Sequence, residues 1–257
     1  MSHNPSPWRL ALLLTFALTI LGIAFFAPSF TKSTTTSEKT DPDTQLVRSL
    51  LSENLSDRTF SFATIAEATS GKKVIPLDDS ETHQRVVAAI NTALSTILPE
   101  LSKPETPIQS LARINEASRF FEDALLEKLN STPGLSCDIP PTKSGTHQRS
   151  GYPDLRITDT ASGAVFYLDP KLVAEDSLDS TLRSFYFEPK DETLKITDDA
   201  VHLLVGISHN GKPGKWEFKD WRLVDVSKIR VRLKAEFQAS NADLYRETKL
   251  SLPAEAR

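Results

Sequence analysis

Residues 152–172, YPDLRITDTASGAVFYLDPKL, predict a β-hairpin and decide the fold. Two short apolar runs, residues 155–157 and 164–168, flank a polar turn that ends in glycine, which is the pattern of two neighbouring strands. Side chains two positions apart in a strand point to the same side, so Asp169 and Lys171 are expected on one face. The hairpin therefore places a carboxylate beside an ammonium group.

A second carboxylate belongs to the same hairpin. Asp154 begins its first strand and is expected beside Asp169 and Lys171. Two carboxylates and an ammonium group are costly in an apolar strand unless a further cation joins them. Mg²⁺ takes one or two carboxylates and keeps waters for a phosphate ligand. The pattern predicts a metal site at which Lys171 assists an attacking water or offsets charge on a phosphate.

The spacing of these residues resembles the PD-(D/E)XK signature of restriction-endonuclease-like nucleases. Pro153-Asp154 is followed fifteen residues later by Asp169-Pro170-Lys171. The resemblance implies that both aspartates hold Mg²⁺, with Mn²⁺ as a second possible metal, and that Lys171 assists the water that cleaves DNA. It also implies a restriction-endonuclease-like fold of the α/β (α+β) class, in which helices flank a mixed central β-sheet.

A helix that precedes the hairpin extends the resemblance to residues 115–172. Such nucleases often take a further glutamate from this helix, and Phe121-Glu122 in FFEDALLEKLN resembles that element. Glu122 lies at the edge of the apolar stripe, whereas Asp123 and Glu127 are expected on the opposite, solvated face. The resemblance implies that Glu122 is a catalytic residue and a third metal ligand.

Hydrophobic periodicity predicts the other elements of the domain. Helical spacing of apolar residues indicates two long helices, at residues 81–98 and from 106 or 107 to 129. Further apolar or alternating runs indicate three more strands, at residues 201–207, 220–226 and 228–235. Helices followed by several strands are typical of a mixed sheet.

The last of these strands carries a candidate nucleic-acid interface. One face of residues 228–235 is basic, with Lys228, Arg230, Arg232 and Lys234, and the other is apolar. Such a line suits a phosphate backbone, and Arg149 adds positive charge near the hairpin. The alternative is a solvated face that discourages edge pairing. Because the net charge is −4, any binding of DNA depends on such local clustering.

The amino terminus predicts a membrane segment. Residues 10–27 form an uncharged run of 18 residues, long enough to cross a bilayer as a single-pass anchor, with a cleaved signal sequence as the alternative. Residues 1–9 are a short flank, 28–43 are rich in Ser, Thr and charge and suit a flexible tether, and 44–257 form the restriction-endonuclease-like domain. These features predict a membrane protein, with the side faced by the domain left open.

Other chemistries find no support in the sequence. The single cysteine, Cys137, excludes an internal disulfide, and no Cys/His spacing suits zinc. Residues 206–212 resemble part of a phosphate-binding loop, but Pro213 replaces the required Ser or Thr. The prediction is a membrane-tethered, Mg²⁺-dependent DNA nuclease. The alternative is a membrane-anchored binding or assembly module of the same fold, in which Asp154, Asp169 and Lys171 have no catalytic role.

Overall fold

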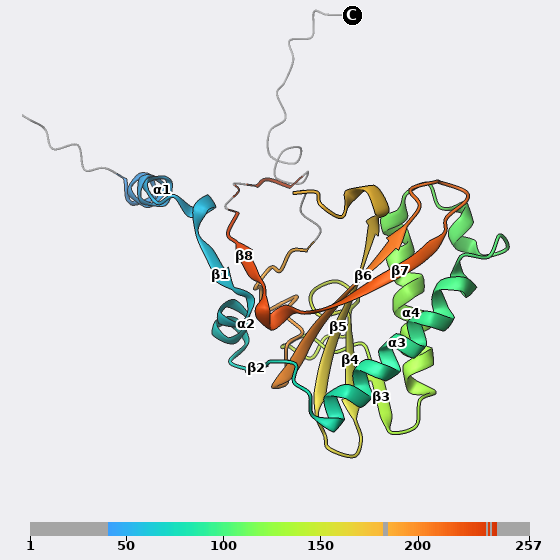
Figure 1. The fold of residues 1–257 in the computed structure, drawn as a ribbon. Helices are drawn as coiled ribbons and strands as arrows, with labels where there is room; N and C mark the ends of the chain where they lie inside the picture. The colour runs from blue at the N-terminus through green and yellow to red at the C-terminus, as the bar shows by residue number, and fades with distance from the viewer. Residues whose placement is uncertain (1–40, 182–184, 235, 237, 241–257) are drawn as a thin grey trace, which may run out of the picture. The chain divides into compact units, whose positions relative to one another are not determined.

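The computed structural model describes residues 41–181, 185–234, 236 and 238–240. Two units are separated between Val47 and Arg48, and the second carries the sheet and the predicted site. The described helices are α1 Pro42–Ser52, α2 Phe62–Ser70, α3 Glu81–Leu101 and α4 Ser118–Asn130, with short 3₁₀ turns η1 Leu55–Asp57, η2 Pro107–Ser110, η3 Ile114–Ala117, η4 Glu175–Ser177 and η5 Val226–Lys228. The described strands are β1 Thr59–Ser61, β2 Val74–Ile75, β3 Leu135–Asp138, β4 Leu155–Asp159, β5 Val165–Ala174, β6 Ala200–His209, β7 Phe218–Asp225 and β8 Arg230–Arg232 (Figure 1).

A mixed six-stranded sheet forms the centre of this unit. Five strands have the order β2-β6-β5-β4-β3. The sixth strand, β7, pairs with β6 on the edge that also carries the short strand β2. The β5–β6 and β2–β6 pairs are parallel, whereas β3–β4, β4–β5 and β6–β7 are antiparallel. The predicted hairpin and the mixed central sheet are therefore confirmed.

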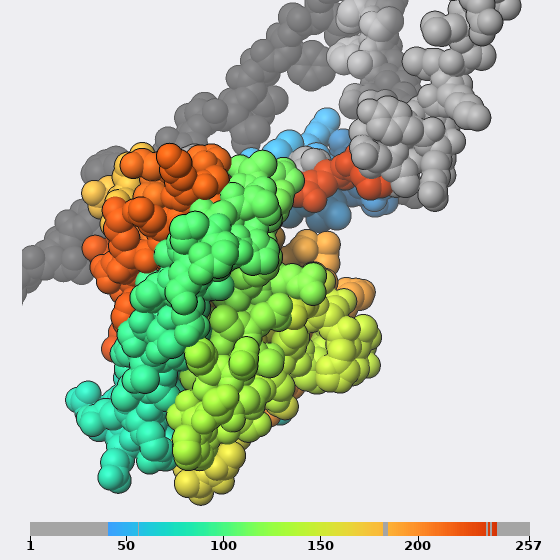
Figure 2. All heavy atoms as spheres, turned by 90° about the vertical axis from the view of Figure 1, so that its right-hand side faces the viewer, coloured from blue at the N-terminus to red at the C-terminus, as the bar shows by residue number. Residues whose placement is uncertain are grey.

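Helices α3 and α4 cover one face of the sheet, and Figure 2 shows them side by side. The side chain of Ser80 caps α3 by accepting a hydrogen bond from the amide of His83. Both helices bury an apolar stripe against the strands, which is why they dock here. The stripes consist of Val86, Ile90, Leu94 and Ile97 in α3 and of Phe121, Leu125 and Leu129 in α4.

The second long helix begins later than predicted. Residues 107–110 and 114–117 form two 3₁₀ turns, and α4 starts only at Ser118. A tertiary contact replaces helical hydrogen bonds in this segment, since the Gln109 amide bonds both backbone groups of Trp216, at 2.7 and 2.9 Å. Pro107, which has no amide hydrogen, opens the first turn.

The predicted membrane localisation is corrected by the structure. No helix of the described residues is both long and apolar enough to cross a bilayer. The longest of them, α3 with 21 residues, is amphipathic and packs on the sheet. The predicted span, residues 10–27, lies outside the described residues, and the last two residues of the predicted tether already belong to α1.

An aromatic cluster fills the other face of the sheet at the start of β5 and β6. His202 is fully buried there, stacks on Tyr152 and accepts or donates a hydrogen bond of 3.0 Å to the Tyr152 hydroxyl. Tyr167 and Phe62 contact the imidazole edge to face or at a tilt. Burial lowers the pKa of His202 to about 3, against a smaller opposing effect of the Asp225 charge.

Acid is therefore expected to destabilise the fold through His202. Between pH 6.5 and 3 the unfolded chain binds a proton at this residue that the folded chain does not, so stability falls as pH falls through that window. We expect His202→Gln to flatten the dependence of the unfolding free energy on pH by up to about 1.4 kcal/mol per pH unit. Urea titrations at several pH values measure this slope. Equal slopes for both proteins would contradict the assignment.

Candidate active site

The register of the hairpin brings the two aspartates together. Leu155 of β4 pairs with Leu168 of β5, so Asp154 and Asp169, the next residues outward, stand opposite each other. Both leucines are buried in the core under α3 and α4. Because side chains alternate along a strand, Asp154 and Asp169 project from the opposite face of the sheet.

Lys171 completes this group, which we call the hairpin site (Asp154, Asp169 and Lys171). Its Nζ atom lies 2.5 Å from Asp169 Oδ2 and 3.6 Å from Asp154 Oδ2. The Asp169 side chain is only 3% exposed, and no described residue gives its Oδ2 a hydrogen bond of standard geometry. A buried carboxylate oxygen is thus left to one ammonium group and to any ligand that enters the site.

Strand β5 continues past Pro170, which decides where Lys171 points. The pairing of β5 with β4 ends at Leu168, so the missing amide of Pro170 costs no hydrogen bond to β4. Pairing with β6 runs on through Ala174. The alternation of side chains is therefore kept, and Lys171 shares the face of Asp169 as predicted.

Asp154 is held partly protonated at neutral pH. Burial raises its pKa, the neighbouring carboxylate of Asp169 raises it further, and Lys171 opposes both effects, so that the pKa is about 7. Two carboxylates that share a buried space repel one another unless one is neutralised. A proton takes that role in the absence of another cation.

The raised pKa predicts that Asp154→Asn stabilises the metal-free protein. The pKa of Asp154 is about 7 in the folded chain, against 3.8 in the unfolded chain. Between these pH values the folded chain binds the proton more tightly than the unfolded chain does, so stability is lost as pH rises. Asparagine stays neutral, so the variant is expected to be more stable at about pH 8 by at most about 4 kcal/mol. Thermal unfolding in EDTA measures the gain. It should vanish near pH 4, and a gain that is independent of pH would contradict the explanation.

Glu122 of α4 lies at the margin of this group and is paired with Arg149. Its Oε2 atom is 3.0 Å from Arg149 Nη1, and the same guanidinium also binds Asp123. Asp123 and Glu127 are exposed, as expected for the solvated face of the helix, although Arg149 also bridges Asp123 to Glu122. Burial and then the charge of Asp154 raise the pKa of Glu122, while Arg149 lowers it. The role of Glu122 as a metal ligand stays a prediction.

Sequence reasoning missed Lys195, a second ammonium group beside the carboxylates. The residue is fully buried, and its Nζ atom donates a hydrogen bond of 3.2 Å to the Arg149 carbonyl. Burial lowers its pKa, whereas the charges of Asp154, Glu122 and Asp169 act against that shift. Its backbone amide also bonds the Tyr152 carbonyl, so Lys195 fastens the loop that leads to Asp154.

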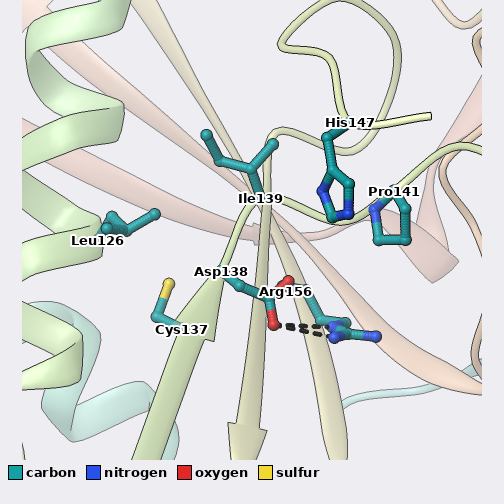
Figure 3. A pocket seen from close by; sticks show the side chains of 7 residues that line it. All are labelled: Leu126, Cys137, Asp138, Ile139, Pro141, His147 and Arg156. Atoms are coloured by element: carbon teal, nitrogen blue, oxygen red, sulfur yellow. Dashed lines mark hydrogen bonds and ion pairs between the residues drawn. The ribbon is translucent and has the colours of Figure 1, made fainter. Parts of the chain in front are cut away.

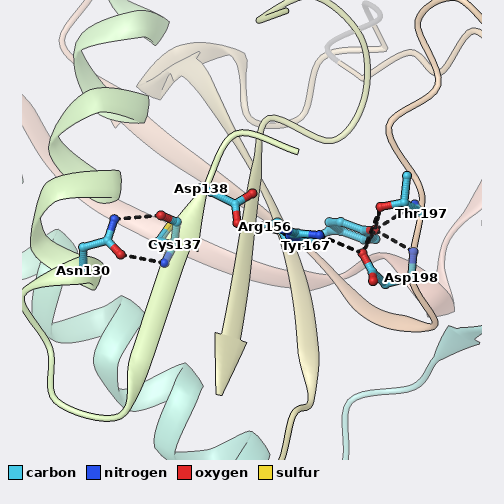
Figure 4. A network of polar contacts seen from close by, with 7 residues as sticks. All are labelled: Asn130, Cys137, Asp138, Arg156, Tyr167, Thr197 and Asp198. Atoms are coloured by element: carbon cyan, nitrogen blue, oxygen red, sulfur yellow. Dashed lines mark hydrogen bonds and ion pairs between the residues drawn. The ribbon is translucent and has the colours of Figure 1, made fainter. Parts of the chain in front are cut away.

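A polar network holds the segment that carries Lys195 (Figure 4). The Tyr167 hydroxyl donates to Asp198 Oδ2 at 2.9 Å and accepts from the backbone amides of Thr197 and Asp198. Arg156 joins the same carboxylate, at 3.4 Å, to Asp138. Arg156 belongs to β4 and Tyr167 to β5. The network therefore ties the segment that carries Lys195 to the two strands of the hairpin.

The two aspartates of the hairpin site suit a divalent cation. Asp154 and Asp169 offer hard oxygen atoms on adjacent strands, which matches the one or two carboxylates that Mg²⁺ takes from proteins. The under-bonded Oδ2 atom of Asp169 and the shared proton of Asp154 both indicate room for positive charge. Among the described residues no group of three or more His, Cys, Asp or Glu side chains converges on one point, and Glu122 as a third ligand stays a prediction.

The predicted basic strand is wrong in its extent. Only Arg230–Arg232 is a strand, and it pairs with β1 rather than with the central sheet. Lys228 lies in a turn because the Asp225 side chain accepts the Ser227 amide and contacts the Lys228 ammonium. Arg230 bonds Thr59, and Lys234 pairs with Glu236. The role of these residues and of Arg149 in binding nucleic acid stays a prediction.

A cavity of the described structure lies away from the hairpin site. It measures about 560 Å³ and is lined by Leu126, Cys137, Asp138, Ile139, Pro141, His147 and Arg156 (Figure 3). None of the predicted catalytic residues lines it. Its arginine is paired with Asp138, which faces it across the β3–β4 ladder. The cavity therefore does not compete with the hairpin site as a place for chemistry.

Comparison with known proteins identifies the family of the chain. The profile of the Type II restriction enzyme MjaV family matches residues 55–248. The chain is also similar to a curated protein, the type II restriction enzyme MjaV of Methanocaldococcus jannaschii, at 29% identity over 202 residues. That alignment covers 73% of this chain and 85% of the relative. The region matched by the family profile contains the hairpin site, Glu122 and Lys195.

Proposed function

The chain belongs to the Type II restriction enzyme MjaV family, and we propose that it is a metal-dependent endonuclease that hydrolyses phosphodiester bonds in DNA at the hairpin site. One observation carries the proposal. Two carboxylates on adjacent strands lie 2.5 and 3.6 Å from one ammonium group, and the buried Oδ2 atom of Asp169 has no hydrogen bond of standard geometry from the described residues. Such an arrangement is costly to the fold, which fits a site kept for chemistry.

The two aspartates are the groups that would hold Mg²⁺ or Mn²⁺. Bound there, the metal supplies a water of lowered pKa and offsets charge on the phosphate. Asp169 is fixed by burial and by the β5–β6 ladder, so its carboxylate needs little reorganisation to accept a ligand. Asp154 must lose its shared proton, which the pKa of about 7 allows at neutral and higher pH.

Lys171 supports the reaction as a charged group. Burial works to lower its pKa, but the charges of Asp169 and then Asp154 outweigh it and raise the pKa above the ordinary value. The side chain is therefore an ammonium ion at neutral pH, which favours the offsetting of phosphate charge over the role of a general base. Lys195 has no exposed surface, so its contribution is to balance the carboxylates from within and to hold the loop before Asp154.

The fragment pattern of a digest tests the proposed function. We expect the full chain to cut a long DNA of mixed sequence into discrete fragments in Mg²⁺, because the related enzyme carries the name of a type II restriction enzyme. A continuous smear of fragments would show that the protein is a nuclease without sequence preference. No cutting of any DNA with either metal would overturn the proposal and favour a binding module.

A further inference from the structure

The sheet face of the hairpin site continues across two more strands. Lys171 of β5 pairs with Gly206 of β6, and Gly206 pairs with Arg222 of β7. Residues paired directly across strands project from the same face. Lys171 and Arg222 therefore stand in one row on one face, with a glycine between them that contributes no side chain.

This part of the face is open. Along β7, Arg222 and Val224 are exposed, whereas Trp221 and Leu223 pack against the core under the helices. A pocket of about 250 Å³ lies here, with Gly206 as part of its lining. A Cβ atom built on Gly206 would find no atom closer than the Arg222 carbonyl oxygen, at 4.0 Å. The absence of a side chain at Gly206 thus leaves a hollow between the two basic residues.

The guanidinium of Arg222 has no ion-pair partner among the residues that the structure describes. Arg222 makes no hydrogen bond through its side chain and no ion pair with the residues that the structure describes. The other basic groups near the site are engaged: Arg149 binds two carboxylates, and Lys171 binds two more. Asp220 also lines the pocket and keeps its negative charge, but its Oδ1 atom accepts the backbone amide of Trp221, and the carboxylate forms no ion pair with Arg222 in the described structure. Arg222 is therefore free to bind an anion.

The spacing of the row suits a DNA strand. Neighbouring strands of a sheet lie about 4.8 Å apart, so the backbones of Lys171 and Arg222 are separated by roughly 10 Å. Successive phosphates of one DNA strand rise by about 3.4 Å along the helix axis. A strand whose scissile phosphate lies at Lys171 would bring another phosphate to Arg222 within about three nucleotides.

We propose that the pocket over Gly206 binds a backbone phosphate of the DNA strand that is cut, with the Arg222 guanidinium as its donor. The inference rests on the proposed function, since it takes the scissile phosphate to lie at the hairpin site. Arg222 contacts substrate away from the reacting atoms and is therefore a binding residue that sets the position of the strand. The half-buried side chain of Val173 and the exposed side chain of Val224 give the pocket an apolar rim beside the sugars.

Binding of DNA by Arg222→Ala tests the proposal, with Lys128→Ala as the matched control. Both changes remove one positive charge, but Lys128 lies on α4, which covers the opposite face of the sheet, and pairs with Glu100. We expect Arg222→Ala to weaken binding about tenfold and to reduce the salt dependence by about one released ion. Lys128→Ala should change neither value appreciably.

A scan of the substrate locates the contact. Duplexes that carry a single neutral methylphosphonate at successive positions are bound to the full-length wild-type protein and to Arg222→Ala in EDTA. At one position, within about three nucleotides of the cut mapped in Mg²⁺, the modification should weaken wild-type binding but leave Arg222→Ala unaffected. Gly206→Val, which suits a strand and fills the hollow, should weaken binding at that same position without a loss of charge.

The outcomes separate the two proposals. Equal binding by wild type and Arg222→Ala, or a loss that no single phosphate accounts for, would overturn the phosphate pocket whether or not the protein cuts DNA. If the wild type binds DNA through Arg222 at one phosphate but never cleaves it, the binding assignment stands and the proposed nuclease function fails. Equal losses in Lys128→Ala and Arg222→Ala would likewise overturn the pocket, because they would reflect net charge alone.

Discussion

Replacing Asp169 by asparagine is expected to reduce the single-turnover rate of metal-dependent DNA cleavage at least about a thousandfold. The change is nearly isosteric and removes only the negative charge of a side chain that is 3% exposed. In the proposed site this negative charge holds the metal. It also balances the positive charge of the Lys171 ammonium group, which lies 2.5 Å away. An amide can do neither well, because it is a weaker ligand and its NH₂ group faces the ammonium unfavourably.

The matched control for this variant is Asp138→Asn. Asp138 is also a strand aspartate with an ion pair, to Arg156 at 2.9 Å, but it lies outside the hairpin site. Rates are measured with enzyme in excess, and circular dichroism checks that both variants remain folded. We expect Asp138→Asn to cut at close to the wild-type rate. Similar activity of the two variants, whether high or low, would show that Asp169 has no special role.

Replacing Lys171 by methionine is expected to slow cleavage by about a hundredfold to a thousandfold, while DNA binding falls much less. Methionine keeps most of the volume and apolar stem but leaves the carboxylates of Asp154 and Asp169 without their nearest cation. The effect should appear in the chemical step, because the ammonium meets charge that grows on the phosphate during the reaction. The metal-free protein is also expected to be less stable, since a buried carboxylate loses its partner.

Lys219→Met serves as the control for Lys171→Met. Lys219 is the second residue of β7 and pairs on the surface with Glu175 at 3.3 Å, so its removal changes the net charge equally without touching the hairpin site. Single-turnover cleavage and DNA affinity are measured for both proteins. A Lys171→Met variant that cuts at the wild-type rate once DNA is saturating would assign Lys171 to binding and contradict its role in the reaction.

The hairpin could be predicted from sequence because its pattern is local. Alternating apolar residues, a polar turn and the i, i+2 relation of Asp169 and Lys171 all lie within 21 residues. The apolar stripes of α3 and α4 are equally local, and they were found. The start of α4 was missed because Gln109 bonds a residue more than one hundred positions away, which no periodicity reports.

The rest of the site depends on tertiary contacts. Lys195 stands between Leu194 and Ile196 in a polar stretch, and an alternation of three residues is too short to assign a face. Its place beside Asp154 follows from the Tyr167 network and from the loop that it fastens. The sequence predicted the strand that carries Arg222. Its place in the same row as Lys171 follows only from the strand order β5-β6-β7.

The alternation at residues 228–235 shows the opposite limit. The pattern was correct for Arg230 and Arg232, which are exposed on either side of Val231. Lys228 does not belong to the strand, because the Asp225 side chain accepts hydrogen bonds from the amide and the hydroxyl of Ser227 and so stabilises a turn at residues 226–228. A local side-chain hydrogen bond thus outweighs the strand preference that the alternating pattern indicated. The strand that pairs with β8, β1, lies about 170 residues away in the sequence, so its position could not be predicted from the local pattern.

The central claim is tested most directly by the metal dependence of DNA cleavage by the full-length wild-type protein. A time course on long duplex DNA is recorded with EDTA, and then with Mg²⁺ or Mn²⁺ in excess over the chelator. The account predicts no cutting in EDTA and cutting that begins when either metal is supplied. Equal cutting in EDTA, or none after metal is restored to protein that still binds DNA, would contradict a metal-dependent nuclease site at Asp154 and Asp169.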